Sequence, residues 1–265
     1  MSSQTRVGVV GARGRMGRIV ADIFRQSGDE VVESDIDFGP APAELAAICQ
    51  VVVLAAPIPA LEGILAELGP RTRPDGVTLD IASVKEGPVS AMLAHCQGEV
   101  IGGHPLFGPG VASPRGQVFF VCPARGTRWR DWLTARLELA GCRVVETTAR
   151  DHDLLMAKVQ ALRHMLVCAF GLGLAELGFR PETELALAGQ WFPALWDMLE
   201  RQSSQPAGLF ADLAVHNPHV PGAALALGRA ASAVTAAYAA GDRSAIAALM
   251  DRAARVLERP SRQEP

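Results

Sequence analysis

Residues 6–17 read RVGVVGARGRMG, and this stretch decides the fold of the chain. A strand-like run, 6–10, leads directly into the glycine loop GARGRMG, 11–17, and then into helical spacing. A tight strand-to-helix turn needs a residue without Cβ, Gly14 lets the backbone approach a pyrophosphate, and Gly17 allows close packing of helix on strand. The spacing GxxGxxG differs by one residue from the usual GxGxxG, so its place at the first strand–helix junction carries the interpretation. The stretch predicts a dinucleotide-binding domain.

The alternation of strand and helix continues through the first half of the chain. Strands rich in β-branched residues are expected at 6–10, 30–35, 50–56, 76–82, 99–103, 117–122 and 142–146. Helical spacing lies between them, as at 15–27 and 59–69. Continuous apolar strands separated by helices indicate a parallel sheet covered on both faces. The predicted fold class is α/β: an N-terminal Rossmann-type doubly wound parallel sheet with a C-terminal all-helical domain.

After Thr147 the sequence is rich in Ala and Leu and shows no strand. Helical segments are expected at 151–177, 182–201, 206–215, 223–239 and 242–258, and the tail 259–265 is expected to be frayed. A boundary near residue 150 would divide an NAD(P)-binding domain, 1–150, from a helical substrate and dimerisation domain, 151–265. These helices have few polar faces, so we expect a homodimer, with a monomeric helical subdomain as the alternative. The apolar run 165–175 is about half of a bilayer span and is interpreted as a buried core helix.

Composition narrows the classes of partner. The chain has 265 residues, of which 49% are hydrophobic, and a formal charge of −3, so disorder is excluded and neither nucleic acid nor a membrane is expected. No signal peptide is evident. The five cysteines, none closer than 20 residues to the next, form no CxxC motif and are expected to be reduced core residues of a cytoplasmic protein. HNPH, 216–219, has no cluster of further ligands, so no metal is expected. The class of partner that these observations favour is a small-molecule substrate.

An acidic residue at the end of the second strand bears on the cofactor. Asp35 lies 24 residues after Gly11, where a carboxylate can accept hydrogen bonds from an adenosine ribose, and this favours NAD. Asp37 is an alternative carboxylate. Arg13 or Arg15 could instead meet a 2′-phosphate, so NADP is the alternative cofactor.

Two further motifs, DIASVK at 80–85 and GHPLFGP at 103–109, begin where expected strands end. Ligands of this fold class bind at that edge of the sheet. His104, fixed by a following proline and flanked by glycines, is expected to be exposed and rigidly aimed, as a general base must be. Ser83 and Lys85 join it from the neighbouring strand end. A lone histidine is more often structural, and the placement at this edge argues for catalysis.

Five stretches resemble, in order, the prephenate dehydrogenase family, and most closely the dehydrogenase part of the bifunctional chorismate mutase/prephenate dehydrogenase. They are GARGRMG (11–17), AAPI (55–58), LDIASVKEGP (79–88), GGHPLFGP (102–109) and HDLLMAKVQALRH (152–164). The resemblance implies NAD-dependent oxidative decarboxylation of prephenate to 4-hydroxyphenylpyruvate in tyrosine biosynthesis. The glycine loop is also similar to that of dihydrodipicolinate reductase, whose His-His and Lys-rich signature is missing here. The expected cofactor-binding residues are Gly11, Arg13, Gly14, Arg15, Met16, Gly17, Asp35, Ala56 and Pro57.

The resemblance also implies roles for three residues of the strand-end motifs. His104 matches the catalytic histidine that takes the proton from the ring 4-hydroxyl, and a neutral imidazole is available as a base near pH 7. Ser83 matches a serine that touches this hydroxyl and orients the histidine. Lys85 would add positive charge near a dianionic substrate, or is a surface lysine.

Further roles fall on the helical half. His164 matches a second active-site histidine, with a core histidine as the alternative. Arg201 matches an arginine that grips a substrate carboxylate, with a helix-end cation as the alternative. His152 matches a structural residue, and Asp151 or Asp153 is expected to cap its helix.

One departure from the family affects the substrate. The bifunctional enzyme has a further arginine about two helical turns before the one matching Arg201, and here that place falls near Pro193. Prephenate, arogenate and 4-amino-4-deoxyprephenate are therefore all open as substrates. A catalytically silent NAD(P)-binding regulator is the alternative of another class. We find no mutase helix or regulatory ACT domain, so any tyrosine inhibition is expected at the active site itself.

Overall fold

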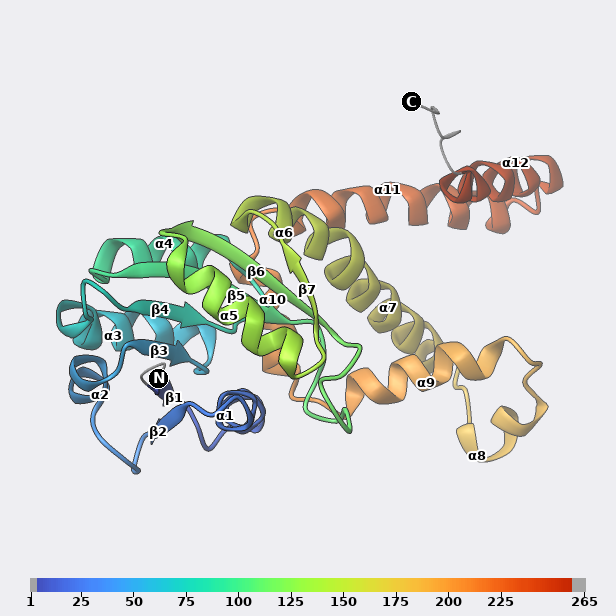
Figure 1. Ribbon diagram of the computed structural model, residues 1–265. Helices are drawn as coiled ribbons and strands as arrows, with labels where there is room; N and C mark the ends of the chain where they lie inside the picture. The colour runs from blue at the N-terminus through green and yellow to red at the C-terminus, as the bar shows by residue number, and fades with distance from the viewer. Residues whose placement is uncertain (1–3, 259–265) are drawn as a thin grey trace. The chain divides into compact units, whose positions relative to one another are not determined.

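Seven strands form one sheet in the order β2-β1-β3-β4-β5-β6-β7 in the computed structural model, which describes residues 4–258 (Figure 1). The strands are β1 (Arg6–Val10), β2 (Glu30–Ser34), β3 (Val51–Leu54), β4 (Val77–Asp80), β5 (Glu99–Pro105), β6 (Val118–Arg125) and β7 (Arg143–Glu146). Each coincides with an expected strand. The predicted fold class, a doubly wound sheet followed by helices, is confirmed.

The sheet is parallel with one exception. Strands β1 to β5 are parallel to their neighbours, as are β6 and β7, but β6 runs antiparallel to β5. The connection between β5 and β6, residues 106–117, contains no helix. A parallel return would need a long crossover, usually a helix, so this short loop allows only the reversed direction.

Helices cover both faces of the sheet because side chains alternate along each strand. On one face Val7, Val9 and Leu79 pack with α1 (Arg15–Gln26) and α5 (Arg128–Leu139). On the other face Val10, Val52 and Leu54 pack with α2 (Pro42–Ile48), α3 (Ile58–Leu68) and α4 (Glu86–His95). Two hydrophobic layers therefore hold the strand ends in fixed positions.

Beyond β7 the described residues are helical. A continuous helix consists of α6 (Ala149–Met156), a π-helical turn (Ala157–Ala161) and α7 (Leu162–Glu176), and it is followed by α8 (Pro181–Glu184), a 3₁₀ turn (Leu185–Leu187), α9 (Phe192–Ser203) and α10 (Ala207–His216). The single helix expected at 182–201 is wrong. Pro193 lies in the first turn of α9, where its missing N–H costs nothing, whereas inside a longer helix it would remove a hydrogen bond.

Two expectations about burial also need correction. Only Val167 is buried in α7, whereas Leu166 and Leu172 are 51% and 64% exposed, so the run 165–175 is not a buried core helix in the single chain. Cys168 is exposed, and the other four cysteines are buried. Both departures leave apolar side chains of α7 uncovered.

Contacts within the chain group it into two units, Met1–His219 and Val220–Pro265. The second contains α11 (Val220–Ala239) and α12 (Arg243–Ala254), joined at Gly241, with Asp242 accepting hydrogen bonds from the Ser244 and Ala245 amides. The last strand ends at Glu146, and the boundary near 150 stays a prediction. The expected fraying of 259–265 lies outside the described residues.

Two helices are long and apolar enough, by length and composition alone, to span a bilayer. Ala149–Glu176 has a mean hydropathy of 1.3, and Val220–Ala239 has 1.2. Core helices of proteins without a membrane pass the same test. The expectation that no membrane is involved stays a prediction.

Candidate active site

The carboxyl ends of β1, β2 and β3 surround a cavity of about 650 Å³. Strand order reverses at β1, which lies between β2 and β3, and ligands of open α/β sheets bind at such a point. Five of the expected cofactor-binding residues line this nucleotide cavity: Gly11, Gly14, Asp35, Ala56 and Pro57. Residues from three separate segments of the chain therefore share one cavity at this edge of the sheet.

The glycine loop is shaped by backbone contacts. Gly11 has φ +81°, and a Cβ on it would lie 2.7 Å from the Ala55 carbonyl oxygen. A Cβ on Gly17 would lie 2.2 Å from the Gly11 carbonyl oxygen, so Gly17 brings α1 against the loop. Gly14 precedes α1, whose N-terminus has no side-chain cap and no acidic residue in its first turn. The positive end of this helix is free for an anion, which fits a dinucleotide pyrophosphate.

Asp35 follows β2 at the edge of the nucleotide cavity. Its Oδ2 accepts a hydrogen bond from the Arg13 amide at 2.8 Å and its Oδ1 one from the Ile36 amide at 2.9 Å. These contacts hold the carboxylate in place while leaving lone pairs for ribose hydroxyls. The Arg13 guanidinium lies 5.4 Å from the Phe38 ring centre and lines a separate recess of about 350 Å³, and Arg15 is exposed.

A second cavity of about 500 Å³ brings together Ser83, His104 and His164. Ser83 follows β4, His104 lies near the end of β5, and His164 belongs to α7. Met16, two residues after Gly14, also lines this cavity, so the glycine loop reaches both cavities. Three side chains separated by up to 81 positions in the sequence therefore meet in one space next to the glycine loop.

The π-helical turn helps to bring His164 there. His152 and His164 are 12 residues apart, about 3.3 turns of an α-helix, which would point them in different directions. A π-helical turn accommodates one extra residue, so the spacing corresponds to about three full turns. Val159 and Gln160 of this turn also line the cavity. The irregular turn thus lets both histidines serve one site.

His104 is buried, with only 2% of its surface exposed, which corrects the expectation of an exposed histidine. Its Nδ1 lies 2.8 Å from Nε2 of His152, and Nδ1 of His152 lies 2.8 Å from Oδ1 of Asp153. Burial, assisted by His152 and the Lys85 ammonium, holds the pKa of His104 well below its usual value. His104 is therefore a neutral imidazole at pH 7, able to accept a proton from the cavity.

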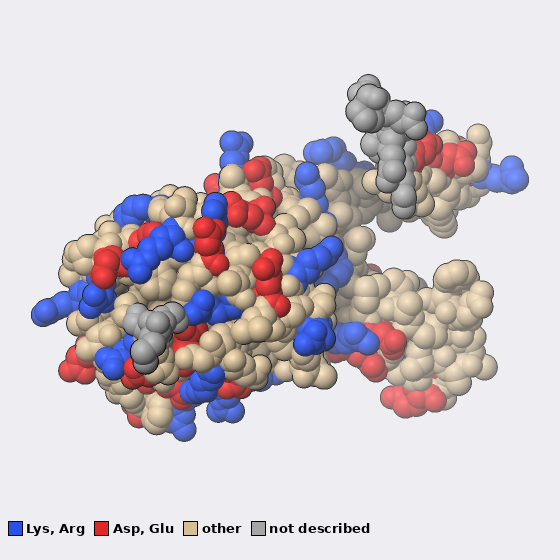
Figure 2. All heavy atoms as spheres, viewed as in Figure 1, with Lys and Arg blue, Asp and Glu red and all other residues tan. Residues whose placement is uncertain are grey.

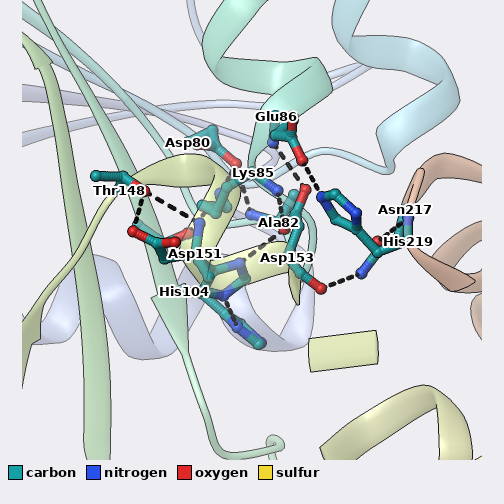
Figure 3. A network of polar contacts seen from close by, with 12 residues as sticks. Asp80, Ala82, Lys85, Glu86, His104, Thr148, Asp151, Asp153, Asn217 and His219 are labelled. Atoms are coloured by element: carbon teal, nitrogen blue, oxygen red, sulfur yellow. Dashed lines mark hydrogen bonds and ion pairs between the residues drawn. The ribbon is translucent and has the colours of Figure 1, made fainter. Parts of the chain in front are cut away.

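Asp153 caps a different helix from its own. Its carboxylate accepts hydrogen bonds from the Lys85 and Glu86 amides, at 2.8 and 2.9 Å, at the N-terminus of α4 (Figure 3). The cap of α6 is Thr148, whose Oγ1 accepts from the Asp151 amide at 3.0 Å. The expectation that Asp153 caps its own helix is wrong because tertiary packing brings it to α4.

Lys85 lies neither on the surface nor in the cavity. Its ammonium is fully buried, pairs with Asp80 and donates to the Gly103 carbonyl at 2.7 Å (Figure 3). Burial raises the pKa of Asp80, and Lys85 opposes this shift. Lys85 therefore compensates a buried carboxylate and fixes the backbone beside His104.

Positive charge near the second cavity comes from two arginines. Arg163 lines this cavity, and its Nη2 lies 2.7 Å from Nε2 of His164. Burial, and then Arg163, lowers the pKa of His164 to about 4. Arg201 of α9 lines a side cavity of about 230 Å³ that shares Arg163 and Phe210 with the main one. Arg201 thus lies beside the cavity rather than in its wall.

Sequence reasoning missed three residues of this site: Arg163, His152 as a partner of His104, and Asp153 as its continuation. Arg163 directly precedes His164 in VQALRH and could have been singled out as a nearby cation. The contact between His104 and His152 spans 48 positions and has no signal in one sequence.

Comparisons with known proteins agree on a family. Residues 13–146 match the nucleotide-binding domain of prephenate dehydrogenase. The chain is 35% identical over 205 residues to the "T-protein" of Enterobacter agglomerans, covering 77% of this chain but only 55% of that one. It is 32% identical over 262 residues to the 4-amino-4-deoxyprephenate dehydrogenase of Streptomyces pristinaespiralis, covering 91% and 87%.

Among solved structures, the fold is similar to that of prephenate dehydrogenase from Aquifex aeolicus in complex with hydroxyphenyl propionate and NAD⁺. The TM-score is 0.74 with 18% identity, covering 97% of this chain and 98% of that one. The likeness in fold extends through both the strand-rich and the helical part of the chain.

Proposed function

Because this chain belongs to the prephenate dehydrogenase family, we propose that it is the NAD-dependent enzyme that oxidatively decarboxylates prephenate to 4-hydroxyphenylpyruvate in tyrosine biosynthesis. The observation that carries the proposal is the meeting of Ser83, His104 and His164 in one cavity beside the glycine loop. A dehydrogenase needs a base at the hydroxyl that becomes a carbonyl and a hydride acceptor next to it. The two adjoining cavities offer both places.

His104 is the catalytic base in this proposal. The buried, neutral imidazole accepts the proton of the ring 4-hydroxyl. The O–H electron pair stays on the oxygen and forms the ring carbonyl as the hydride leaves the same carbon. Loss of the ring carboxylate as carbon dioxide then leaves its electron pair in the ring, which becomes aromatic. Ser83 binds the same hydroxyl and orients it toward His104.

Gly11, Gly14, Asp35, Ala56 and Pro57 hold the cofactor. When bound, oxidised NAD supplies the acceptor for the hydride that leaves the ring. Asp35 favours NAD because a carboxylate accepts hydrogen bonds from ribose hydroxyls and repels a 2′-phosphate. Arg13, in its recess beside Asp35, is the feature that would favour NADP.

Substrate carboxylates are bound by two arginines, with the neutral imidazole of His164 beside them. Arg201, His164 and the newly found Arg163 lie together around the junction of the main and side cavities. A planar guanidinium binds a carboxylate through two parallel hydrogen bonds. We assign the ring carboxylate and the side-chain carboxylate to this group, which Lys85 cannot join from its buried place beside Asp80.

The second candidate substrate is 4-amino-4-deoxyprephenate. Two features favour it: the place where the bifunctional enzyme has a further arginine falls at or near Pro193, and the match to the relative from Streptomyces pristinaespiralis covers 91% of this chain and 87% of that one. Arogenate, which carries an amino group on the side chain, is the third.

We also propose a cytoplasmic homodimer formed through the helical half. Apolar side chains of this half lie exposed in the single chain, and around α8 and α9 an uncharged stretch of surface lies beside a few charged side chains (Figure 2). They include Leu172, Leu177, Leu187, Trp191 and Leu225. All five cysteines are free, as in a reducing compartment. Light scattering at micromolar concentration should give twice the 28.0 kDa of one chain.

The test is absorbance of reduced nicotinamide when the purified protein meets each of the three substrates with NAD or NADP. Highest kcat/KM with prephenate and NAD supports the proposal. A higher value with the amino substrate or arogenate moves the assignment to that dehydrogenase. Binding of NAD without turnover of any substrate would instead indicate a silent regulator.

A further inference from the structure

We infer that His152 and Asp153 are positioning residues that hold His104 as its Nδ1–H tautomer, with the Nε2 lone pair left for the cavity. The base role of His104 rests on the proposed function, whereas its tautomer can be observed without any substrate. All three side chains are buried, with 2% of His104 and none of His152 or Asp153 exposed. Water therefore does not compete for their hydrogen bonds.

The tautomer of His104 follows from the Asp153 carboxylate. In the hydrogen-bonded series of His104, His152 and Asp153, this group can only accept hydrogen bonds. The Asp153 carboxylate receives hydrogen bonds from the Lys85 and Glu86 amides, so it acts as an acceptor there. Nδ1 of His152, 2.8 Å from Oδ1 of Asp153, must then carry a proton. Nε2 of a neutral His152 consequently has a lone pair.

This lone pair determines the state of His104. Nε2 of His152 lies 2.8 Å from Nδ1 of His104, so Nδ1 of His104 must donate. Its Nε2 is left unprotonated, and His104 lines the cavity together with Ser83. Phe120 packs edge-on against the His152 ring, with centres 5.2 Å apart, and restricts its rotation. The base is therefore prepared before substrate arrives.

The same carboxylate also positions the segment that carries Ser83. Asp153 accepts hydrogen bonds from the Lys85 and Glu86 amides, two and three residues after Ser83, and the Asn217 side chain donates to the Asp153 carbonyl at 2.9 Å (Figure 3). One residue thus fixes both groups that meet the substrate hydroxyl. This coupling explains why a carboxylate is buried next to a histidine pair.

Protonation of the pair would reverse the arrangement. If His152 took up a second proton, it would donate to His104, and His104 would place its own proton on Nε2, where it blocks base catalysis. The charged or titratable groups that face His104 are His152 on α6, Lys85 with Asp80 behind it, and Arg163 and His164 across the cavity. Lys85 and Arg163 oppose added positive charge on the pair, whereas the Asp153 carboxylate, 2.8 Å from Nδ1 of His152, favours it.

The direct test is the ¹⁵N spectrum of the histidine side chains in the uniformly labelled wild-type protein at pH 7.5. Signals are assigned by their loss in His104→Asn and His152→Gln. We expect both residues as neutral Nδ1–H tautomers. Observation of His104 as the Nε2–H tautomer, or as a cation at this pH, overturns the inference whether or not any substrate is turned over.

The kinetic test compares three variants of histidines in this network. His152→Phe removes the acceptor, and we expect kcat to fall roughly 10- to 100-fold while KM changes little, within the contribution of a general base. His152→Gln keeps an acceptor and should recover part of the loss. His219→Gln, which alters a contact with Glu86 but none with His104, should retain kcat.

The pH profile separates positioning from mere folding. In the wild type, the acid limb of the pH profile of kcat reports the protonation of the coupled pair His104 and His152. In His152→Phe this limb should shift, because His104 then titrates without its partner. A wild-type value of kcat in His152→Phe contradicts the positioning role of His152. A lower kcat with an unchanged acid limb of the pH profile contradicts it too.

Discussion

His104 illustrates how one side chain combines burial with access to a cavity. Its ring is nearly inaccessible to solvent, yet it lines the space that Ser83 and His164 share. A base in this setting is neutral at pH 7 because burial penalises its charged form. These properties suit the role of base that the proposed function gives to His104.

We expect His104→Asn to lower kcat roughly 100-fold or more, because an amide cannot accept the proton of the ring hydroxyl. The Kd for NAD, measured by fluorescence titration, should stay within about twofold of the wild-type value, since His104 does not line the nucleotide cavity. Near-normal turnover in this variant would refute the role of His104 as base.

Lys85 shows the other use of a buried charge, in stability. We expect Lys85→Met to reduce the free energy of unfolding by about 3–5 kcal/mol in urea denaturation at pH 7, because Asp80 is left buried without its partner. The double variant Asp80→Asn/Lys85→Met should regain most of this loss, since no charge is then left unpaired. Equal stability of the single and the double variant would contradict this account.

At the scale of elements, the strand–helix junctions were predictable and the helical half was less so. Local signals, a run of valines or a glycine loop, mark each strand and its end, and all seven strands were placed from them. The break before Pro193 was missed because the apolar spacing of 182–201 continues across it. The π-helical turn and the His104–His152 contact depend on tertiary packing, which one sequence does not contain.

The first strand–helix junction yields a prediction of its own. We expect Gly17→Ala to weaken NAD binding at least about tenfold and to destabilise the protein by about 1–3 kcal/mol, because its Cβ would overlap the Gly11 carbonyl and displace α1. Gly63→Ala is the matched control, since a Cβ on Gly63 in α3 meets no atom within 4 Å. In this control the free energy of unfolding should rise by up to about 1 kcal/mol, because alanine has the higher helix propensity, and the affinity for NAD should equal that of the wild type. Calorimetric titration and thermal unfolding measure both properties.

At the scale of the whole molecule, the two histidines of the proposed active site, His104 and His164, also affect stability in acid. The folded chain keeps His104 and His164 below the ordinary histidine pKa of 6.5, and that of His164 is about 4. The unfolded chain binds protons on both residues as pH falls through 6.5. Their contribution to stability is therefore complete above about pH 6.5 and is lost progressively below it.

We expect the unfolding free energy of the wild type to fall between pH 6.5 and about 4, and part of this fall to belong to His164. His164→Phe, whose ring can pack against Phe210 as the imidazole does, should lose roughly 2 kcal/mol less than the wild type over this range. His95→Gln, at the end of α4 and away from both cavities, is the control and should follow the wild-type curve. Chemical denaturation at half-unit pH steps measures the slopes. Parallel curves for wild type and His164→Phe would mean that the buried imidazole is not what limits stability in acid.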